Sequence, residues 1–266
     1  MKKWLQLTFP ITLVGTSLLL FTFSLSASVL AQTPTPTPTP APRRPLPKPV
    51  AGPRGFDQYA RREASARLIV GAATRGAQDP ENRLFEDGEA AYQAGNYEKA
   101  VENFAAALKL KPDWTDAHYA LALSLIETKN PQKALEEFKE VLRLKAQYKL
   151  MVFSNYNIGN IYLDLAEYEA AIDAYKYAIA LKPELLEPHY NLGLAYAASD
   201  KVAEALAEFK EAAQLKPDFA EAHFNLAVAY LQSGKKREAE EEQTILAKLD
   251  AKLADKLKAL IEQPGF

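Results

Sequence analysis

Three histidines are the side chains in this sequence that most readily suggest chemistry. They are His118, His189 and His223, and imidazole is a common protein ligand of zinc. They lie 71 and 34 residues apart and fall in one column of a repeated pattern. Equivalent positions on neighbouring helical repeats are about 8–10 Å apart, whereas a shared zinc needs each nitrogen within about 2.1 Å. We therefore expect the histidines to pack against neighbouring helices and to share no metal ion.

The rest of the sequence offers no catalytic pattern. It contains no phosphate-binding loop, nucleophile elbow, His-Glu-x-x-His motif or EF-hand loop. Acidic pairs are frequent, but none has the apolar setting that raises a carboxyl pKa for acid catalysis. The chain has no cysteine, which excludes disulfides, thiolate catalysis and cysteine-based zinc sites. We therefore expect a non-enzymatic protein with no catalytic residues, no bound metal and no cofactor.

The elements that carry the histidines are indicated by an internal repeat. Segments of the type Gly-Asn-Tyr-x-x-Ala are followed by Leu-Lys-Pro, and Pro183 and Pro217 are 34 residues apart. The three instances are Gly95–Ala100 with Leu110–Pro112, Ala166–Ala171 with Leu181–Pro183, and Asp200–Ala205 with Leu215–Pro217. A period of this length is typical of stacked helical hairpins, each too small to bury its own apolar face. It predicts an all-α solenoid, an architecture that more often binds than catalyses.

From Glu81 to about Asp250 the chain resembles the tetratricopeptide repeat family. The resemblance implies a right-handed superhelix of antiparallel helix pairs, in which small residues mark helix crossings, large residues fill the space between helices and prolines end the second helices. The expected repeats are 81–114, 115–148, 152–185, 186–219 and about 220–250, within a solenoid over 79–250. The crossing residues are Gly88, Gly159 and Gly193 with Ala122 and Ala227; the large residues are Phe104, Phe138, Tyr175 and Phe209; the prolines are Pro112, Pro183 and Pro217.

Two departures from the pattern carry predictions. Ala146 stands where a proline is expected, and three extra residues, Lys149 to Met151, precede the third repeat. We expect the second helix of the second repeat to run on there and to change the local twist. Beyond the last repeat, residues 251–262 have leucines at helical spacing and predict a capping helix that covers the final apolar face.

The family resemblance also implies a concave groove lined by the first helices. One column of groove residues is aromatic and another is asparagine, whose amide can pair with both groups of a peptide unit. Aromatic rings supply the contact area that dominates interface energetics. The alternative is that the asparagines only satisfy neighbouring helices. The predicted peptide-binding residues are Asn157, Asn160, Asn191, Asn225, Phe85, Tyr119, Tyr156, Tyr190 and Phe224.

Charge narrows the class of partner. Residues before Glu81 carry a net charge of +7, and Glu81 to Asp250 carry −10. An acidic body argues against nucleic acid, because phosphate binding needs a basic face. The basic carboxylate clamp of some tetratricopeptide proteins is also excluded, because Asp116, Glu187 and Glu221 occupy the first helices. The acidic rim predicts a neutral or basic protein segment, and the basic stretch Arg43–Arg75 of the same chain is one candidate, as an intramolecular lid.

The N-terminus has the layout of a secretory signal. Lys2 and Lys3 precede an uncharged apolar stretch that ends with Val29-Leu30-Ala31. We expect residues 1–31 to be a cleaved signal, the alternative being an uncleaved membrane anchor. Residues 32–55 are a Thr/Pro-rich linker expected to be extended and disordered. Residues 56–78 are basic and can form a short helix that packs on the first repeat, or contacts anionic lipid or the acidic body.

The sequence therefore predicts an exported scaffold or adaptor that binds a protein or extended peptide in a periplasmic, lumenal or envelope assembly. Contact with the membrane would come only through an uncleaved N-terminus or the basic segment. The alternative is a self-associating structural component of a membrane-proximal complex. The sequence does not determine the oligomeric state, the partner or the pathway.

Overall fold

A computed structural model describes residues 79–263 of the 266-residue chain. Within this range the chain forms eleven consecutive α-helices and no strand. The predicted signal (1–31), linker (32–55) and basic segment (56–78) lie outside the described residues. The predicted all-α solenoid is confirmed.

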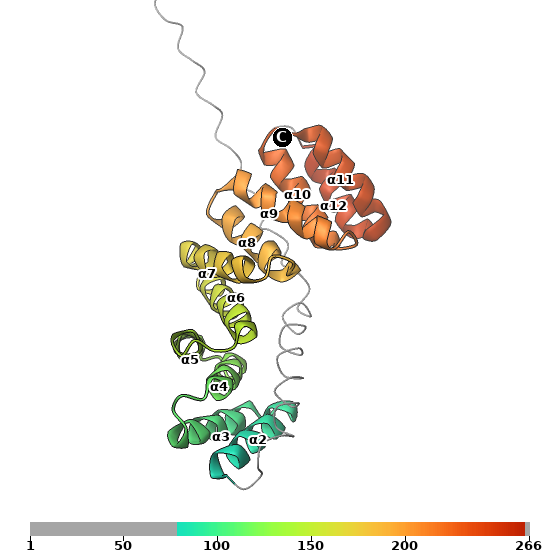
Figure 1. Cartoon of the computed structure of the whole chain (residues 1–266). Coiled ribbons are helices and arrows are strands. Elements are labelled where there is room, and N and C mark those ends of the chain that lie inside the picture. Colours follow the sequence, from blue (N-terminus) through green and yellow to red (C-terminus); the bar gives the residue numbers. More distant parts are fainter. Residues whose placement is uncertain (1–78, 264–266) are drawn as a thin grey trace, which may run out of the picture. The chain divides into compact units, whose positions relative to one another are not determined.

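Ten of the helices form five consecutive pairs, and the eleventh follows the last pair. Each helix packs on the next one along the chain (Figure 1). The first helices of the pairs are α2 (Pro80–Gln93), α4 (Thr115–Glu127), α6 (Tyr148–Asp164), α8 (Leu186–Ala198) and α10 (Ala220–Gln232). The second helices are α3 (Tyr97–Leu110), α5 (Pro131–Arg143), α7 (Tyr168–Leu181), α9 (Val202–Leu215) and α11 (Lys236–Leu249). The last helix is α12 (Ala251–Ile261).

Glycine on the first helix lets the two helices of a pair approach closely. A β-carbon at Gly159 would lie 2.5 Å from a ring carbon of Tyr175, which is itself completely buried. The same clash, at 2.7 Å, would arise between Gly88 and Phe104 and between Gly193 and Phe209. The predicted roles of these three glycines and of the rings opposite them are therefore confirmed.

The turn inside each pair has one residue in the left-handed backbone conformation. Gly95 and Gly234 fill this position in the first and last pairs, with φ of 76° and 71°. The other pairs have Lys129, Ala166 and Asp200 there, with φ between 58° and 63°. The following amide closes each turn by bonding a carbonyl five residues back, as between Glu167 N and Tyr162 O at 2.8 Å. The turn geometry is thus the same along the chain even where glycine is absent.

The junction between α5 and α6 differs from the sequence prediction. The lysine before each of the three prolines is extended, as at Lys111 with φ −133°, because a proline disfavours helical backbone in the residue before it. Without a proline, α5 does not run on but ends at Arg143. Lys145 takes a left-handed φ of 49°, and Ala146 N bonds Val141 O at 3.3 Å.

The three extra residues instead lengthen the next helix. α6 has 17 residues, whereas α4, α8 and α10 have 13 each. α5 and α6 also pack less extensively on each other than the helices at the other junctions between repeats. The prediction that α5 is extended was wrong, although the irregularity does lie at this junction.

The final helix covers the end of the stack. Asp250 is the N-cap of α12, and its carboxylate accepts hydrogen bonds from the backbone N–H groups of Lys252 and Leu253 at 2.9 and 3.0 Å. Leu257 is completely buried and joins a hydrophobic cluster with α10 and α11. This cluster supplies the burial that a next repeat would otherwise provide.

Candidate binding surface

The first helices form one continuous layer. Besides packing on the second helices, α2 contacts α4, α4 contacts α6, and α6 contacts α8. We call the surface formed by α2, α4, α6, α8 and α10 the first-helix face. All of the predicted peptide-binding residues lie on these helices.

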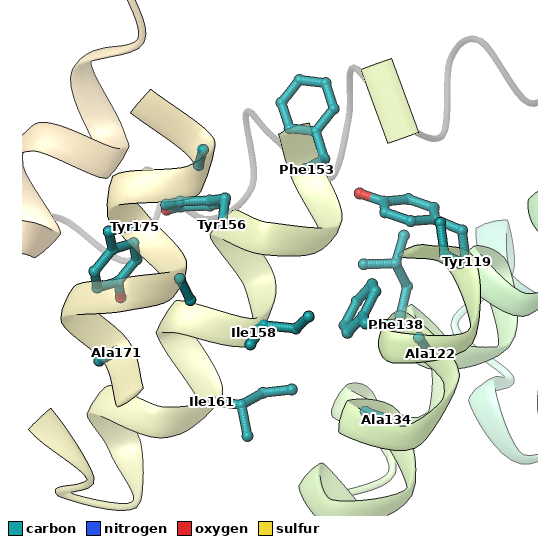
Figure 2. Packing of buried hydrophobic residues seen from close by; sticks show 14 of the residues in the cluster. Tyr119, Ala122, Ala134, Phe138, Phe153, Tyr156, Ile158, Ile161, Ala171 and Tyr175 are labelled. Atoms are coloured by element: carbon teal, nitrogen blue, oxygen red, sulfur yellow. The ribbon is translucent and has the colours of Figure 1, made fainter. Parts of the chain in front are cut away.

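The predicted aromatic column lies in the core and not on an exposed surface. Its five rings, Phe85, Tyr119, Tyr156, Tyr190 and Phe224, are each at most 2% exposed. Figure 2 shows Tyr119 beside Phe138 and Tyr156 beside Tyr175, with ring centroids 5.5 and 6.1 Å apart. Since these rings fill the space inside the helix pairs, we correct their assignment from ligand contact to packing.

At two junctions the ring also packs on the residue that precedes the next first helix. Phe85 stacks on Trp114 with centroids 4.5 Å apart, and Tyr190 lies 4.7 Å from Phe219. Trp114 directly precedes α4, and Phe219 directly precedes α10. At these two junctions the aromatic column therefore also packs against the residue that leads into the next first helix.

Two of the predicted asparagines also have a structural role. Asn157 and Asn225 are only 4% and 3% exposed. Asn157 Nδ2 donates to the Tyr119 hydroxyl at 3.3 Å and to the Phe153 carbonyl at 2.8 Å, and Asn225 Nδ2 donates to the Tyr190 hydroxyl at 2.9 Å. Each amide thus bonds the tyrosine of the preceding repeat, as the alternative interpretation of the asparagines predicted. The burial and bonds of Asn157 and Asn225 favour this packing role over ligand contact.

Asn160 and Asn191 form a more accessible group, and Asn191 Nδ2 also donates to the Tyr156 hydroxyl of the preceding repeat at 3.4 Å. The Asn160 carbonyl oxygen accepts from Asn191 Nδ2 at 2.8 Å and from the Tyr175 hydroxyl at 2.7 Å. Both asparagines are half-buried. Among residues 79–263 the Asn191 carbonyl oxygen accepts no hydrogen bond, since its bonds all use Nδ2. The pair joins α6 to α8 and presents amide groups on the first-helix face.

The first-helix face is strongly acidic. Its five helices contain nine acidic and only two basic residues. The five second helices contain fourteen acidic and ten basic residues, so their charges largely cancel. The acidic residues of these five helices are Glu81, Glu86, Asp87, Glu89, Asp116, Glu127, Asp164, Glu187 and Glu221, of which Glu89 is buried, and the basic residues are Arg83 and Lys149.

The three histidines each join two repeats. His223 Nδ1 lies 2.6 Å from a Glu242 carboxylate oxygen on the second helix of its own pair, and Nε2 lies 3.0 Å from the Pro217 carbonyl of the preceding repeat. The equivalent distances are 2.6 and 2.8 Å for His118 with Glu137 and Pro112. They are 2.7 and 2.9 Å for His189 with Glu208 and Pro183.

These contacts favour the charged histidine. A carboxylate and a carbonyl both accept hydrogen bonds, so only the imidazolium form can donate to both. Burial lowers the pKa of His118 and His189, but the bonds to glutamate and to the proline carbonyl outweigh it, and each pKa is raised. The bond to Glu242 is the largest influence on His223 and raises its pKa despite burial.

The sequence interpretation missed the glutamates of these contacts. Glu137, Glu208 and Glu242 each follow a histidine by 19 residues, and this constant spacing was a readable signal. The third repeat has no such histidine, and it is also the repeat preceded by Ala146 in place of a proline. Histidine and proline therefore occur together along the chain.

Within residues 79–263, no three His, Cys, Asp or Glu side chains are grouped as metal ligands. None of the helices in that range combines the length and apolar character that a membrane span requires.

Comparisons with known proteins agree with the helix pairs. Residues 159–200 and 195–234 match a family model described as "TPR repeat", and residues 85–149 and 220–252 match two models described as "Tetratricopeptide repeat". No curated protein sequence matches the chain significantly.

Several solved structures share the fold. A crystal structure of MamA is 24% identical with a TM-score of 0.58 and covers 63% of this chain and 96% of its own. MamA from Desulfovibrio magneticus RS-1, from residue 41 to its end, is 20% identical with a TM-score of 0.60. The match covers 66% of this chain and 98% of that structure. YrrB, described as a TPR protein with an unusual peptide-binding site, is 18% identical with a TM-score of 0.59. The match covers 77% of this chain and 98% of that structure. These structures share the fold, and the matches to the family models show that the chain belongs to the tetratricopeptide repeat family.

Proposed function

We propose that this protein is a non-enzymatic adaptor that binds a neutral or basic protein segment on its first-helix face. The observation that carries the proposal is the half-buried pair Asn160 and Asn191 on a face with nine acidic and two basic residues. The Asn191 carbonyl oxygen can accept a peptide N–H, and the carboxylates attract a basic segment. The peptide-binding site described for YrrB, a protein of the same fold, is consistent with this use.

The structure changes which residues a test should alter. Replacing Asn157 or Asn225 would break a bond between repeats at a side chain that is at most 4% exposed, so lost binding would not separate contact from stability. Asn160 and Asn191 also bond across repeats, but their side chains are only half-buried. We therefore choose Asn160→Ala with Asn191→Ala. The matched control is Gln132→Ala with Gln214→Ala, which removes two exposed amides from second helices.

The experiment selects short peptides from a random library on the full chain and measures their affinity for each variant by fluorescence anisotropy. We expect the asparagine variant to bind at least about tenfold more weakly, the loss of one or two net hydrogen bonds, while the glutamine control binds like the wild type. Circular dichroism checks that both variants keep their helices. Equal affinity of the asparagine variant, or failure to select any peptide, would contradict the proposal.

We further propose that the adaptor acts outside the cytoplasm, in a periplasmic, lumenal or envelope assembly. The support is the N-terminal sequence, in which two lysines, an apolar stretch and Val29-Leu30-Ala31 follow in the order of a secretory signal. N-terminal sequencing of the protein purified from its native source should begin at Gln32. An intact Met1 would favour a retained membrane anchor.

Self-association is the competing function for such a solenoid. Light scattering of the purified protein over a range of concentrations separates the two. A monomer at every concentration would favour the adaptor function, in which the first-helix face binds other proteins. A stable oligomer would favour the structural role.

A further inference from the structure

The basic residues of the solenoid are segregated by helix type, which leaves the first helices with the larger net negative charge. With nine acidic and two basic residues, the first-helix face has a net charge of −7, whereas the second helices have a net charge of −4 over fourteen acidic and ten basic residues. No lysine or arginine lies on α4, α8 or α10. Like charges concentrated on one layer repel one another, and a bound cationic segment relieves that repulsion.

The same chain contains a segment of the complementary composition. Residues 43–78 include eight basic and two acidic residues, a net charge of +6. Seven of the eight basic residues are arginine, and the eighth is Lys48. Arginine binds carboxylates through two parallel hydrogen bonds and is more weakly hydrated than lysine, so it gives up less hydration when it does so.

The segment is tethered beside the face that it would bind. It ends two residues before α2, the first helix of that face. Its 36 residues can span up to about 120 Å when extended, whereas five helices spaced by 8–10 Å extend over only about 40 Å. A short tether also gives an effective concentration of about 1 mM. Length and attachment therefore allow the segment to reach every first helix.

We propose that residues 43–78, whose basic side chains extend from Arg43 to Arg75, bind the acidic first-helix face of their own chain and compete there with other proteins. The proposal rests on the proposed use of this face for binding and adds a built-in competitor. A partner must then displace the segment, and its apparent affinity is reduced by the fraction of molecules whose face is already covered.

The test uses a fluorescent synthetic peptide of residues 43–78 as the probe and anisotropy as the readout. Three full-length proteins are compared at about 50 mM salt, where charge contacts are weakly screened. They are the wild type, a segment variant with Arg61→Glu, Arg62→Glu and Arg67→Glu, and a control with Lys133→Glu, Lys210→Glu and Lys248→Glu. The control makes the same change in net charge at exposed positions of the second helices.

We expect the segment variant to bind the probe at least about tenfold more tightly than the wild type, because its own segment no longer covers the face. The control should bind like the wild type. Adding Asp116→Asn, Glu187→Gln and Glu221→Gln to the segment variant should remove the gain. These carboxylates lie on three different first helices.

Three results would overturn the proposal. One is equal binding of the probe by the wild type and the segment variant, and another is an equal gain in the control, which would indicate unspecific charge attraction. The third is a wild-type dimer that the segment substitutions convert to a monomer, because the occupant would then be the segment of a second copy. The random-library peptides do not involve residues 43–78, so the test of the proposed function gives an independent result.

Discussion

Raising the pH through neutrality should weaken the solenoid by deprotonating its three histidines. These are the only histidines of the chain, and it has no cysteine, so few other groups titrate in this range. Contacts with glutamate and with a proline carbonyl raise the pKa of each histidine above 6.5. A raised pKa means that the stabilisation is complete below pH 6.5 and is lost as the pH rises through the pKa of the folded protein.

The magnitude follows from the geometry at each site. The histidine side chains are 12%, 10% and 8% exposed, and each lies 2.6–2.7 Å from its carboxylate. A hydrogen bond to a charged group contributes about 1.5–3 kcal/mol. Allowing for partial solvation of the glutamates, we take about 1 kcal/mol per site, or about 3 kcal/mol for the three.

The assay is urea unfolding followed by circular dichroism between about pH 5.5 and about pH 8.5. Glu242→Gln removes one carboxylate without removing a histidine, and should abolish about one third of the pH dependence. Glu204→Gln is the matched control, because Glu204 is exposed on α9 and belongs to none of the three histidine sites. A free energy of unfolding that stays level or rises above pH 6.5 would refute the reasoning, as would an undiminished slope in Glu242→Gln.

Two substitutions test the backbone geometry of the hairpins by thermal unfolding. Gly159→Ala places a β-carbon 2.5 Å from the buried Tyr175 ring, so we expect a loss of about 1–3 kcal/mol despite the better helix propensity of alanine; an unchanged midpoint would mean that the hairpin tolerates a wider crossing. Ala166→Gly relieves a left-handed φ of 58° and should stabilise by up to about 1 kcal/mol. The same change at the exposed Ala207, in the interior of α9, should destabilise by a similar amount. The reasoning requires changes in stability of opposite sign at the two sites.

The sequence was sufficient for the fold because the repeat specifies it many times over. Glycine opposite a large ring, the Leu-Lys-Pro helix ends and the apolar period recur in several units, so each prediction could be checked within the chain. The one error in a predicted helix end, at Ala146, came from the assumption that α5 needs a proline to end. A left-handed residue and a bond to a carbonyl five residues back ended α5 at Arg143 without it.

The candidate site was predicted less well, because the position of a residue in a repeat column does not show whether its side chain is buried or exposed. The helices that carry the asparagines and aromatic rings were assigned correctly. Burial then separated Asn157 and Asn225 from Asn160 and Asn191, although three of these four share one sequence column. The histidines were correctly expected to pack between helices, yet their glutamate partners lie 19 residues away.

By itself the sequence determined the helical period, the crossing residues, the charge of each segment and the family resemblance. These depend on local spacing and composition, which the chain order preserves. Only the tertiary structure decided that the aromatic rings fill the core and that three asparagines bond the tyrosine of the preceding repeat. It also decided that each histidine contacts a glutamate carboxylate and a proline carbonyl. These contacts depend on how one repeat is rotated against the next, and that rotation is set by the packing of all their side chains together.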